Sequence, residues 1–122
     1  MNRASDYLAL LAALMGAGGV ALAAASTHAA GGDFGRTAAQ FLILHAAALL
    51  GVSASARAAT PRRTRRVLLA GAALALGTLL FSADLAMRAF AGARLFPFAA
   101  PTGGSLMIAS WIALAAVLAL PE

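Results

Sequence analysis

The sequence lacks cysteine and lysine altogether, and it contains only four acidic residues. Without cysteine, the chain can form no disulfide, thiolate metal site or cysteine nucleophile. Only 11% of its 122 residues are charged, whereas about a quarter are charged in a typical soluble domain. With 62% hydrophobic residues and a mean hydropathy of +0.89, the chain has too little polar surface to face water. We therefore expect a protein embedded in a lipid bilayer.

The net charge of +5 comes from nine arginines, and five of them lie in the segment 56–66, read ARAATPRRTRR. This segment separates two apolar runs, and Pro61 is expected to stop a helix that enters it from upstream. An excess of basic over acidic residues can indicate a nucleic-acid partner. Here the arginines flank apolar spans and no soluble domain is left to hold a duplex. We expect the lipid bilayer as a partner and no nucleic acid.

Four apolar runs are long enough to cross a hydrocarbon core of about 30 Å as helices: 7–26, 37–55, 67–87 and 103–120. Backbone polar groups in lipid need internal partners, and no strand-like alternation competes, so helices are expected. The sequence predicts one integral domain over residues 1–122. Its fold class is an all-α membrane protein, an antiparallel up-down bundle of four transmembrane helices. The first run also has the layout of a secretory signal peptide, which remains an alternative for it.

The distribution of arginines predicts the orientation of this bundle. Arg3 and the five arginines of segment 56–66 lie on one side, and Arg36, Arg88 and Arg94 lie on the other. Because cytoplasmic loops carry the excess of basic residues, both termini are predicted to be cytoplasmic. The connection 88–101 is rich in phenylalanine and proline. We expect it to cover the outer end of the bundle or to lie at the membrane interface.

Several polar side chains are expected in the outer half of the bilayer, within the predicted spans or at their ends, and ionisable groups at such depth are candidate functional sites. They are His28, His45, Asp84, Arg88 and Thr102. Asp84 precedes Arg88 by four residues, the favourable order for an ion pair within a helix. His45 is expected to form a hydrogen bond between helices, and the indole N–H of Trp111 to face a protein partner. The spacing of the histidines and Asp84 does not predict a metal site.

Glycine and alanine within the spans predict close helix packing. The glycines expected at helix contacts are Gly16, Gly19, Gly71, Gly77, Gly103 and Gly104. No nucleophile elbow frames the serines, and no glycine-rich phosphate loop follows a strand. We therefore expect no catalytic residue, no cofactor and no enzymatic activity.

Five short segments resemble a known family. They are Thr27-His28, 40–46 (QFLILHA), 80–85 (LFSADL), 100–104 (APTGG) and Ser110-Trp111. In this order they resemble the small membrane proteins of the domain of unknown function 423 family. The resemblance covers nearly the whole chain. It implies a four-span protein of the bacterial inner membrane with no settled biochemical activity.

The chain departs from the family pattern in its third span. Where the family reads Phe-Ser-Gly-Ser-Leu-Tyr, this sequence has Ala83 and Asp84 in place of Gly-Ser and Ala86 in place of Tyr. The family's Thr-Pro-hydrophobic-Gly-Gly motif is read here as Ala-Pro-Thr-Gly-Gly. A role for Asp84 therefore cannot be taken from the family.

The small size and the alanine and glycine faces favour a non-enzymatic accessory or structural subunit, which assembles with a larger membrane complex or with itself. The alternative is a small-solute or proton-coupled transporter that acts as a homo-oligomer and uses Asp84 and His45. Small multidrug carriers have a similar size and number of spans. Their essential acid lies in the first span, where this sequence has none.

Overall fold

The computed structural model describes residues 3–28 and 32–121, which form four α-helices and, within these ranges, no strand. The helices are α1 (Arg3–His28), α2 (Gly32–Ala58), α3 (Pro61–Ala91) and α4 (Ala99–Ala119). Each of the four is long and apolar enough to cross a membrane. The prediction of an all-α protein with four candidate spans is therefore confirmed.

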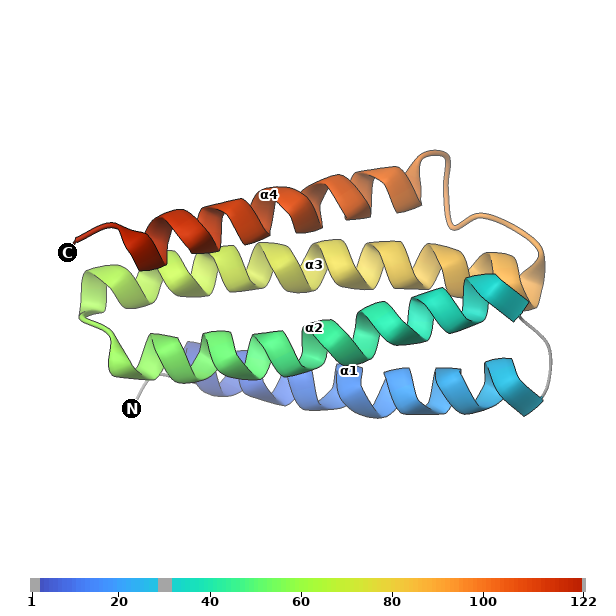
Figure 1. The fold of residues 1–122 in the computed structure, drawn as a ribbon, viewed down its shortest axis with the longest axis horizontal. Coiled ribbons are helices and arrows are strands. Elements are labelled where there is room, and N and C mark those ends of the chain that lie inside the picture. The colour runs from blue at the N-terminus through green and yellow to red at the C-terminus, as the bar shows by residue number, and fades with distance from the viewer. Residues whose placement is uncertain (1–2, 29–31, 122) are drawn as a thin grey trace.

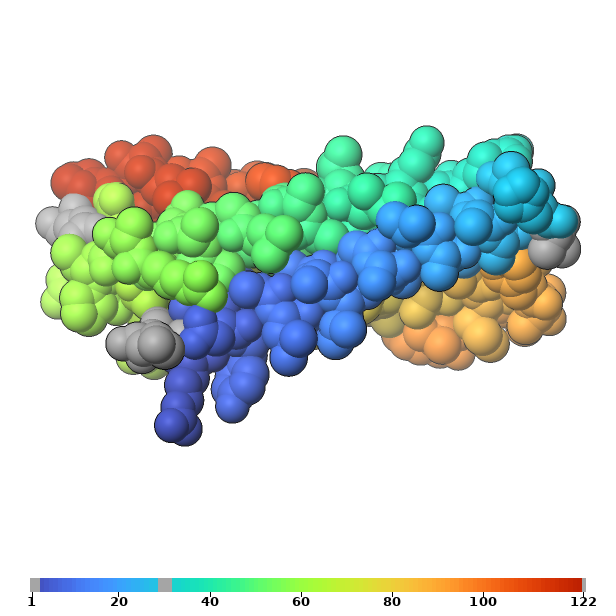
Figure 2. Space-filling model, turned by 90° about the horizontal axis from the view of Figure 1, so that it is seen from below, coloured from blue at the N-terminus to red at the C-terminus, as the bar shows by residue number. Residues whose placement is uncertain are grey.

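Successive helices run in opposite directions, and the two chain ends lie at the same end of the molecule (Figure 1). α3 is the central helix: half of its most apolar window is buried, against 22% for α1 and for α4. α1 packs along α2 and touches α3, and Figure 2 shows it lying obliquely across that face.

The arrangement is more open than the bundle expected from the sequence. Within the described ranges, the backbone of α4 approaches α3 closely but neither α1 nor α2. The four helices therefore form a curved layer in the order α1, α2, α3, α4, which is open between α2 and α4.

The arginine-rich segment is helical, which corrects the expectation of a loop over residues 56–66. Only Ala59 and Thr60 lie outside the helices there, and Pro61 is the first residue of α3. Proline fits the first position of a helix because its missing N–H would have no partner there, and arginine is a good helix former. With 31 residues, α3 is about 46 Å long and exceeds a hydrocarbon core of about 30 Å, so at least one of its ends must reach beyond it.

The connection between α3 and α4 is shorter than expected. α3 continues to Ala91 and ends at Gly92, whose φ of 69° is the left-handed conformation that glycine adopts easily. α4 begins at Ala99, after Phe98 with a φ of 65°. The residues Phe90, Phe96 and Phe98 are 46%, 45% and 70% exposed, so they cover the end of the helices only in part.

The core consists of medium-sized aliphatic side chains between the helices. It includes Leu8, Ala12 and Met15 of α1, Leu49 and Val52 of α2, Val67 and Leu74 of α3, and Met107 and Leu114 of α4. Large apolar side chains also cover the outer faces, for example Leu14 at 62% and Ile112 at 66% exposure. Such faces suit a surrounding lipid phase, where an exposed apolar side chain incurs no hydration penalty.

Candidate functional site

Asp84 is the acid that α3 carries into the apolar region, and its side chain is fully buried. Its Oδ2 accepts a hydrogen bond from Arg88 Nη2 at 2.9 Å, one helical turn further along. Its Oδ1 accepts a second from the backbone N–H of Leu95 at 2.7 Å. The structure thus contains the expected pair with Arg88. It adds a contact that the sequence did not suggest, because a backbone N–H in a loop leaves no mark in a residue pattern.

Arg88 extends this arrangement toward α2. Its guanidinium lies 5.7 Å from the ring centroid of Phe34, which is within the range of a cation–π interaction. The side chain of Arg88 is 21% exposed. Asp84 and Arg88 therefore link the end of α3 to the α3–α4 connection and to the start of α2.

His45 forms a second polar contact, in the middle of the layer. The side chain is 3% exposed, and its Nδ1 lies 2.9 Å from the carbonyl oxygen of Phe41. The indole Nε1–H of Trp111 donates to His45 Nε2 at 3.1 Å. Because an indole N–H can only donate, Nε2 is the acceptor here, and this pairing assigns the ring hydrogen to Nδ1. The contact joins α2 to α4 across the opening between them.

The remaining candidates lie apart from these two contacts. His28 is the last residue of α1, and Thr102 lies in the first turn of α4; both are exposed. In the part of the chain that the structure describes, no three His, Asp or Glu side chains come together as metal ligands would. The predicted polar cluster is therefore not one site. It divides into the Asp84–Arg88 pair, the His45–Trp111 pair and two surface positions.

The helices α3 and α4 approach each other closely at Gly77 of α3 and Gly103 of α4. A Cβ atom added to Gly77 would lie 2.9 Å from the carbonyl oxygen of Gly103, and one added to Gly103 would lie 2.6 Å from the backbone N of Phe81. Both neighbours are backbone atoms and cannot move aside as a side chain can. Glycine at these two positions allows α3 and α4 to pack with their backbones in contact.

The other predicted packing glycines differ in their surroundings. Gly19 of α1 and Gly71 of α3 face side chains of α2, and an added Cβ would lie 2.7 Å from Ile43 Cγ1 and from Val52 Cγ1, respectively. By contrast, the nearest such distance is 3.6 Å at Gly16 and 3.7 Å at Gly104, which is ordinary contact.

Gly35 is a close-packing position that was not predicted from the sequence. An added Cβ there would lie 2.1 Å from Ser26 Oγ of α1. Gly35 lies between the predicted spans 7–26 and 37–55, but the structure includes it in α2. Glycine near a predicted helix end is compatible with a turn and with a close helix contact, so the sequence does not distinguish the two.

The arginine-rich end of the layer is held by a few polar contacts. Asp6 of α1 pairs with Arg57 of α2 at 2.6 Å, and Ser53 Oγ donates to the carbonyl oxygen of Ser5 at 2.7 Å. Arg63 donates to the carbonyl oxygen of Leu120, just after α4. These contacts tie α1 to α2 and α3 to α4 at the end where both termini lie.

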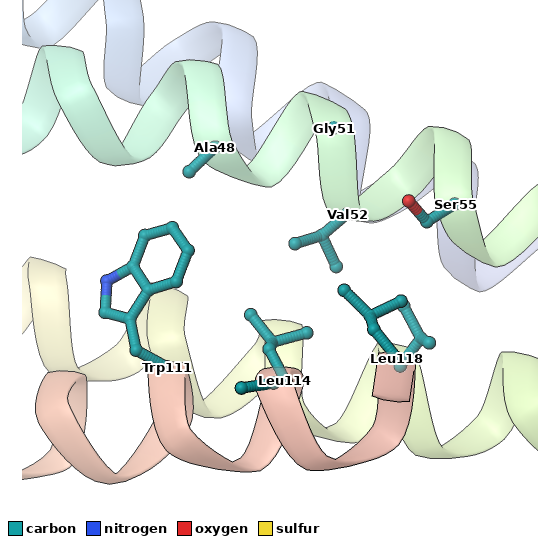
Figure 3. Close-up of a pocket in the computed structure, with 9 residues that line it drawn as sticks. Ala48, Gly51, Val52, Ser55, Trp111, Leu114 and Leu118 are labelled. Atoms are coloured by element: carbon teal, nitrogen blue, oxygen red, sulfur yellow. The ribbon is translucent and has the colours of Figure 1, made fainter. Parts of the chain in front are cut away.

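A groove opens between α2 and α4, as Figure 3 shows. It has a volume of about 400 Å³ and is lined by Ala48, Gly51, Val52, Ser55, Val67, Trp111, Leu114, Ala115 and Leu118. Almost all of these side chains are apolar. The groove suits a hydrocarbon better than a polar solute.

The sequence matches the family described as "Protein of unknown function (DUF423)" over residues 15–104. This match extends from the middle of α1 to the first turns of α4. The chain belongs to the DUF423 family. The resemblance inferred from the sequence motifs is thereby confirmed. No solved structure matches this DUF423 protein.

The Asp84–Arg88 pair and the His45–Trp111 pair both involve the matched region. Asp84, Arg88 and Leu95 lie within it, and so do His45 and the close-packing glycines Gly77 and Gly103. Trp111, the partner of His45, lies beyond it. The family description assigns no activity to any of these residues.

Proposed function

We propose that this DUF423 protein is a non-enzymatic accessory subunit of the bacterial inner membrane. It assembles through its outer helix faces with a larger membrane complex, and both of its termini are cytoplasmic. The observation that carries the proposal is the state of Asp84. Its two oxygens are occupied by Arg88 and by the backbone N–H of Leu95, and its side chain is fully buried. A carboxylate held in this way supports a structural role.

A transport role has less support. A carrier for protons or polar solutes needs an ionisable group that faces a water-accessible path. Three hollows along the described helices are lined mostly by apolar side chains. His45 is likewise engaged on both ring nitrogens, by Phe41 and Trp111.

The shape of the layer also supports assembly. α1 and α4 are its two edges, and each leaves most of its apolar surface uncovered. Ile108 and Ile112 of α4 lie one turn apart and are 64% and 66% exposed, and Leu10 and Leu14 form the corresponding pair on α1 at 58% and 62%. An isolated protein needs only lipid at these faces, whereas a subunit can pack there against a partner helix.

Purification of the tagged chain in mild detergent, with mass spectrometry of what remains bound, tests the proposal. We expect one membrane protein to be retained in a fixed ratio to the tagged chain. A chain that purifies alone, or only with further copies of itself, would overturn the accessory role and favour the transporter alternative.

Two matched double variants refine this test. Ile108→Ala with Ile112→Ala removes the apolar ridge of α4, and Leu10→Ala with Leu14→Ala removes that of α1. All four side chains are exposed, so neither pair of substitutions removes a side chain from the core. Loss of the partner with only one pair would identify the binding face. If both double variants lose the partner and also lose helix content, the loss of binding reflects unfolding and does not identify a binding face. Circular dichroism of each variant measures the helix content.

A further inference from the structure

The groove between α2 and α4 is lined by apolar side chains except for Ser55, and it is open to the side. Ala48 and Gly51 are the small residues on its α2 wall, and Trp111 and Leu118 extend from α4 toward them (Figure 3). In a protein surrounded by lipid, an apolar groove of this shape accommodates a flexible hydrocarbon chain at little cost in desolvation of polar groups.

The first two turns of α3 carry a surplus of positive charge near one end of this groove. Arg62, Arg65 and Arg66 are exposed, and in the described ranges none of them forms an ion pair with a carboxylate. Asp6, the acidic residue of α1, is already paired with Arg57 of α2. A phosphate group is the natural counterion for guanidinium groups at headgroup depth.

The two features are adjacent because the lining of each includes residues of α3 and α4. Arg62, Arg63 and Arg66 line a small hollow together with Val117, Leu120 and Pro121, at the end of α4. The next residues on each helix, Val67 and Leu118, line the groove. The arginines and the groove therefore lie within about one helical turn of each other, the separation of a headgroup and the start of its acyl chain.

We propose that this end of the protein binds one anionic phospholipid, whose phosphate contacts the arginines while an acyl chain occupies the α2–α4 groove. The charge complementarity selects an anionic headgroup, and the apolar lining selects a lipid over a soluble phosphate compound. The inference depends on the placement of the chain in a bilayer and not on the accessory role.

Native mass spectrometry of the full chain tests this with two lipids that differ only in headgroup, phosphatidylglycerol and phosphatidylcholine with the same acyl chains. We expect one phosphatidylglycerol to be retained in preference to phosphatidylcholine. Arg62→Gln with Arg66→Gln should reduce that preference by about 25-fold, about fivefold for each arginine. The control, Arg36→Gln with Arg94→Gln, makes the same change in charge at the other end and should leave the preference unchanged.

A second pair of variants tests the groove itself. Gly51→Leu places a side chain in the groove, and no atom lies within 4 Å of an added Cβ there. Gly18→Leu makes the same change on α1, where an added Cβ is equally free. We expect Gly51→Leu to lose the retained lipid and Gly18→Leu to keep it, with unchanged helix content in both.

Three results would overturn the proposal. The first is equal retention of both lipids by the wild type. The second is removal of the headgroup preference by millimolar inorganic phosphate, which would mean that the arginines bind free phosphate. The third is a wild-type dimer that becomes monomeric with Gly51→Leu while lipid retention stays the same. In that case a second copy of the chain, and not an acyl chain, covers the groove.

Discussion

Asp84 joins the end of α3 to the α3–α4 connection, since its Oδ1 accepts the backbone N–H of Leu95 at 2.7 Å while its Oδ2 binds Arg88 at 2.9 Å. The contact spans 11 residues of the chain. One buried carboxylate thus fixes both the last turns of α3 and the path by which the chain returns into α4.

Replacing Asp84 by Asn should therefore destabilise the protein. The substitution leaves the guanidinium of Arg88 without its counterion and weakens the bond to Leu95, and we expect a loss of about 2 kcal/mol in the free energy of unfolding. Thermal melting followed by circular dichroism in detergent measures the change. The control is Asp33→Asn, which removes an exposed ion pair with Arg36 and should change stability by less than about 0.5 kcal/mol. Equal stability of the two variants would contradict the role given to Asp84.

The contact between α3 and α4 gives a second prediction. Gly77→Ala and Gly103→Ala each place a methyl group against backbone atoms, so the two helices must separate, and we expect a loss of about 1–3 kcal/mol for each. Gly18→Ala is the control, because its added Cβ meets no atom within 4 Å. It should leave stability unchanged or raise it slightly, by up to about 1 kcal/mol. A similar effect at all three positions would show that the spacing of α3 and α4 is not set by these glycines.

The hydrogen bond between Trp111 and His45 gives a third prediction. Trp111→Phe keeps an aromatic ring on α4 but removes the N–H donor, and His45→Leu removes the acceptor. A double-mutant cycle of unfolding free energies should give a coupling of about 0.6 kcal/mol, the average for such bonds between membrane helices. A coupling near zero would mean that α2 and α4 are not joined by this bond.

Labelling of single cysteines tests the orientation of the chain. The sequence has no cysteine of its own, so each introduced thiol gives an unambiguous signal. Thr60→Cys lies between α2 and α3, and Ala93→Cys lies in the exposed α3–α4 connection. With the arginine-rich end in the cytoplasm, an impermeant thiol reagent should label Ala93→Cys in intact cells and Thr60→Cys only after lysis. The reverse pattern would place both termini outside.

The sequence predicted those features that depend on local pattern. Hydropathy alone is sufficient to recognise four helices that could cross a membrane, and the i, i+4 spacing of Asp84 and Arg88 predicts a pair that the structure contains. The helix ends at the arginine-rich segment were not predicted correctly. A proline can either end one helix or occupy the first position of the next, and Pro61 occupies the first position of α3.

The arrangement of the polar candidates could not be read from the sequence. Counting residues along a span gives the depth of His45, Asp84 and Thr102 in the membrane, but not the direction in which each helix faces. The structure shows that these three side chains belong to separate surroundings. The open side between α2 and α4 was also not predicted, since four apolar helices fit a closed bundle and an open layer equally well.

The central claim is that the buried polar groups of this DUF423 protein hold its helices together and do not move protons or solutes. The most direct test is proton flux into liposomes that contain the purified wild type or Asp84→Asn, measured beside the melting temperature of each. We expect neither protein to raise the flux above that of empty liposomes, and we expect Asp84→Asn to melt at a lower temperature. A wild-type flux that Asp84→Asn abolishes without any change in melting temperature would contradict the claim and identify the protein as a carrier.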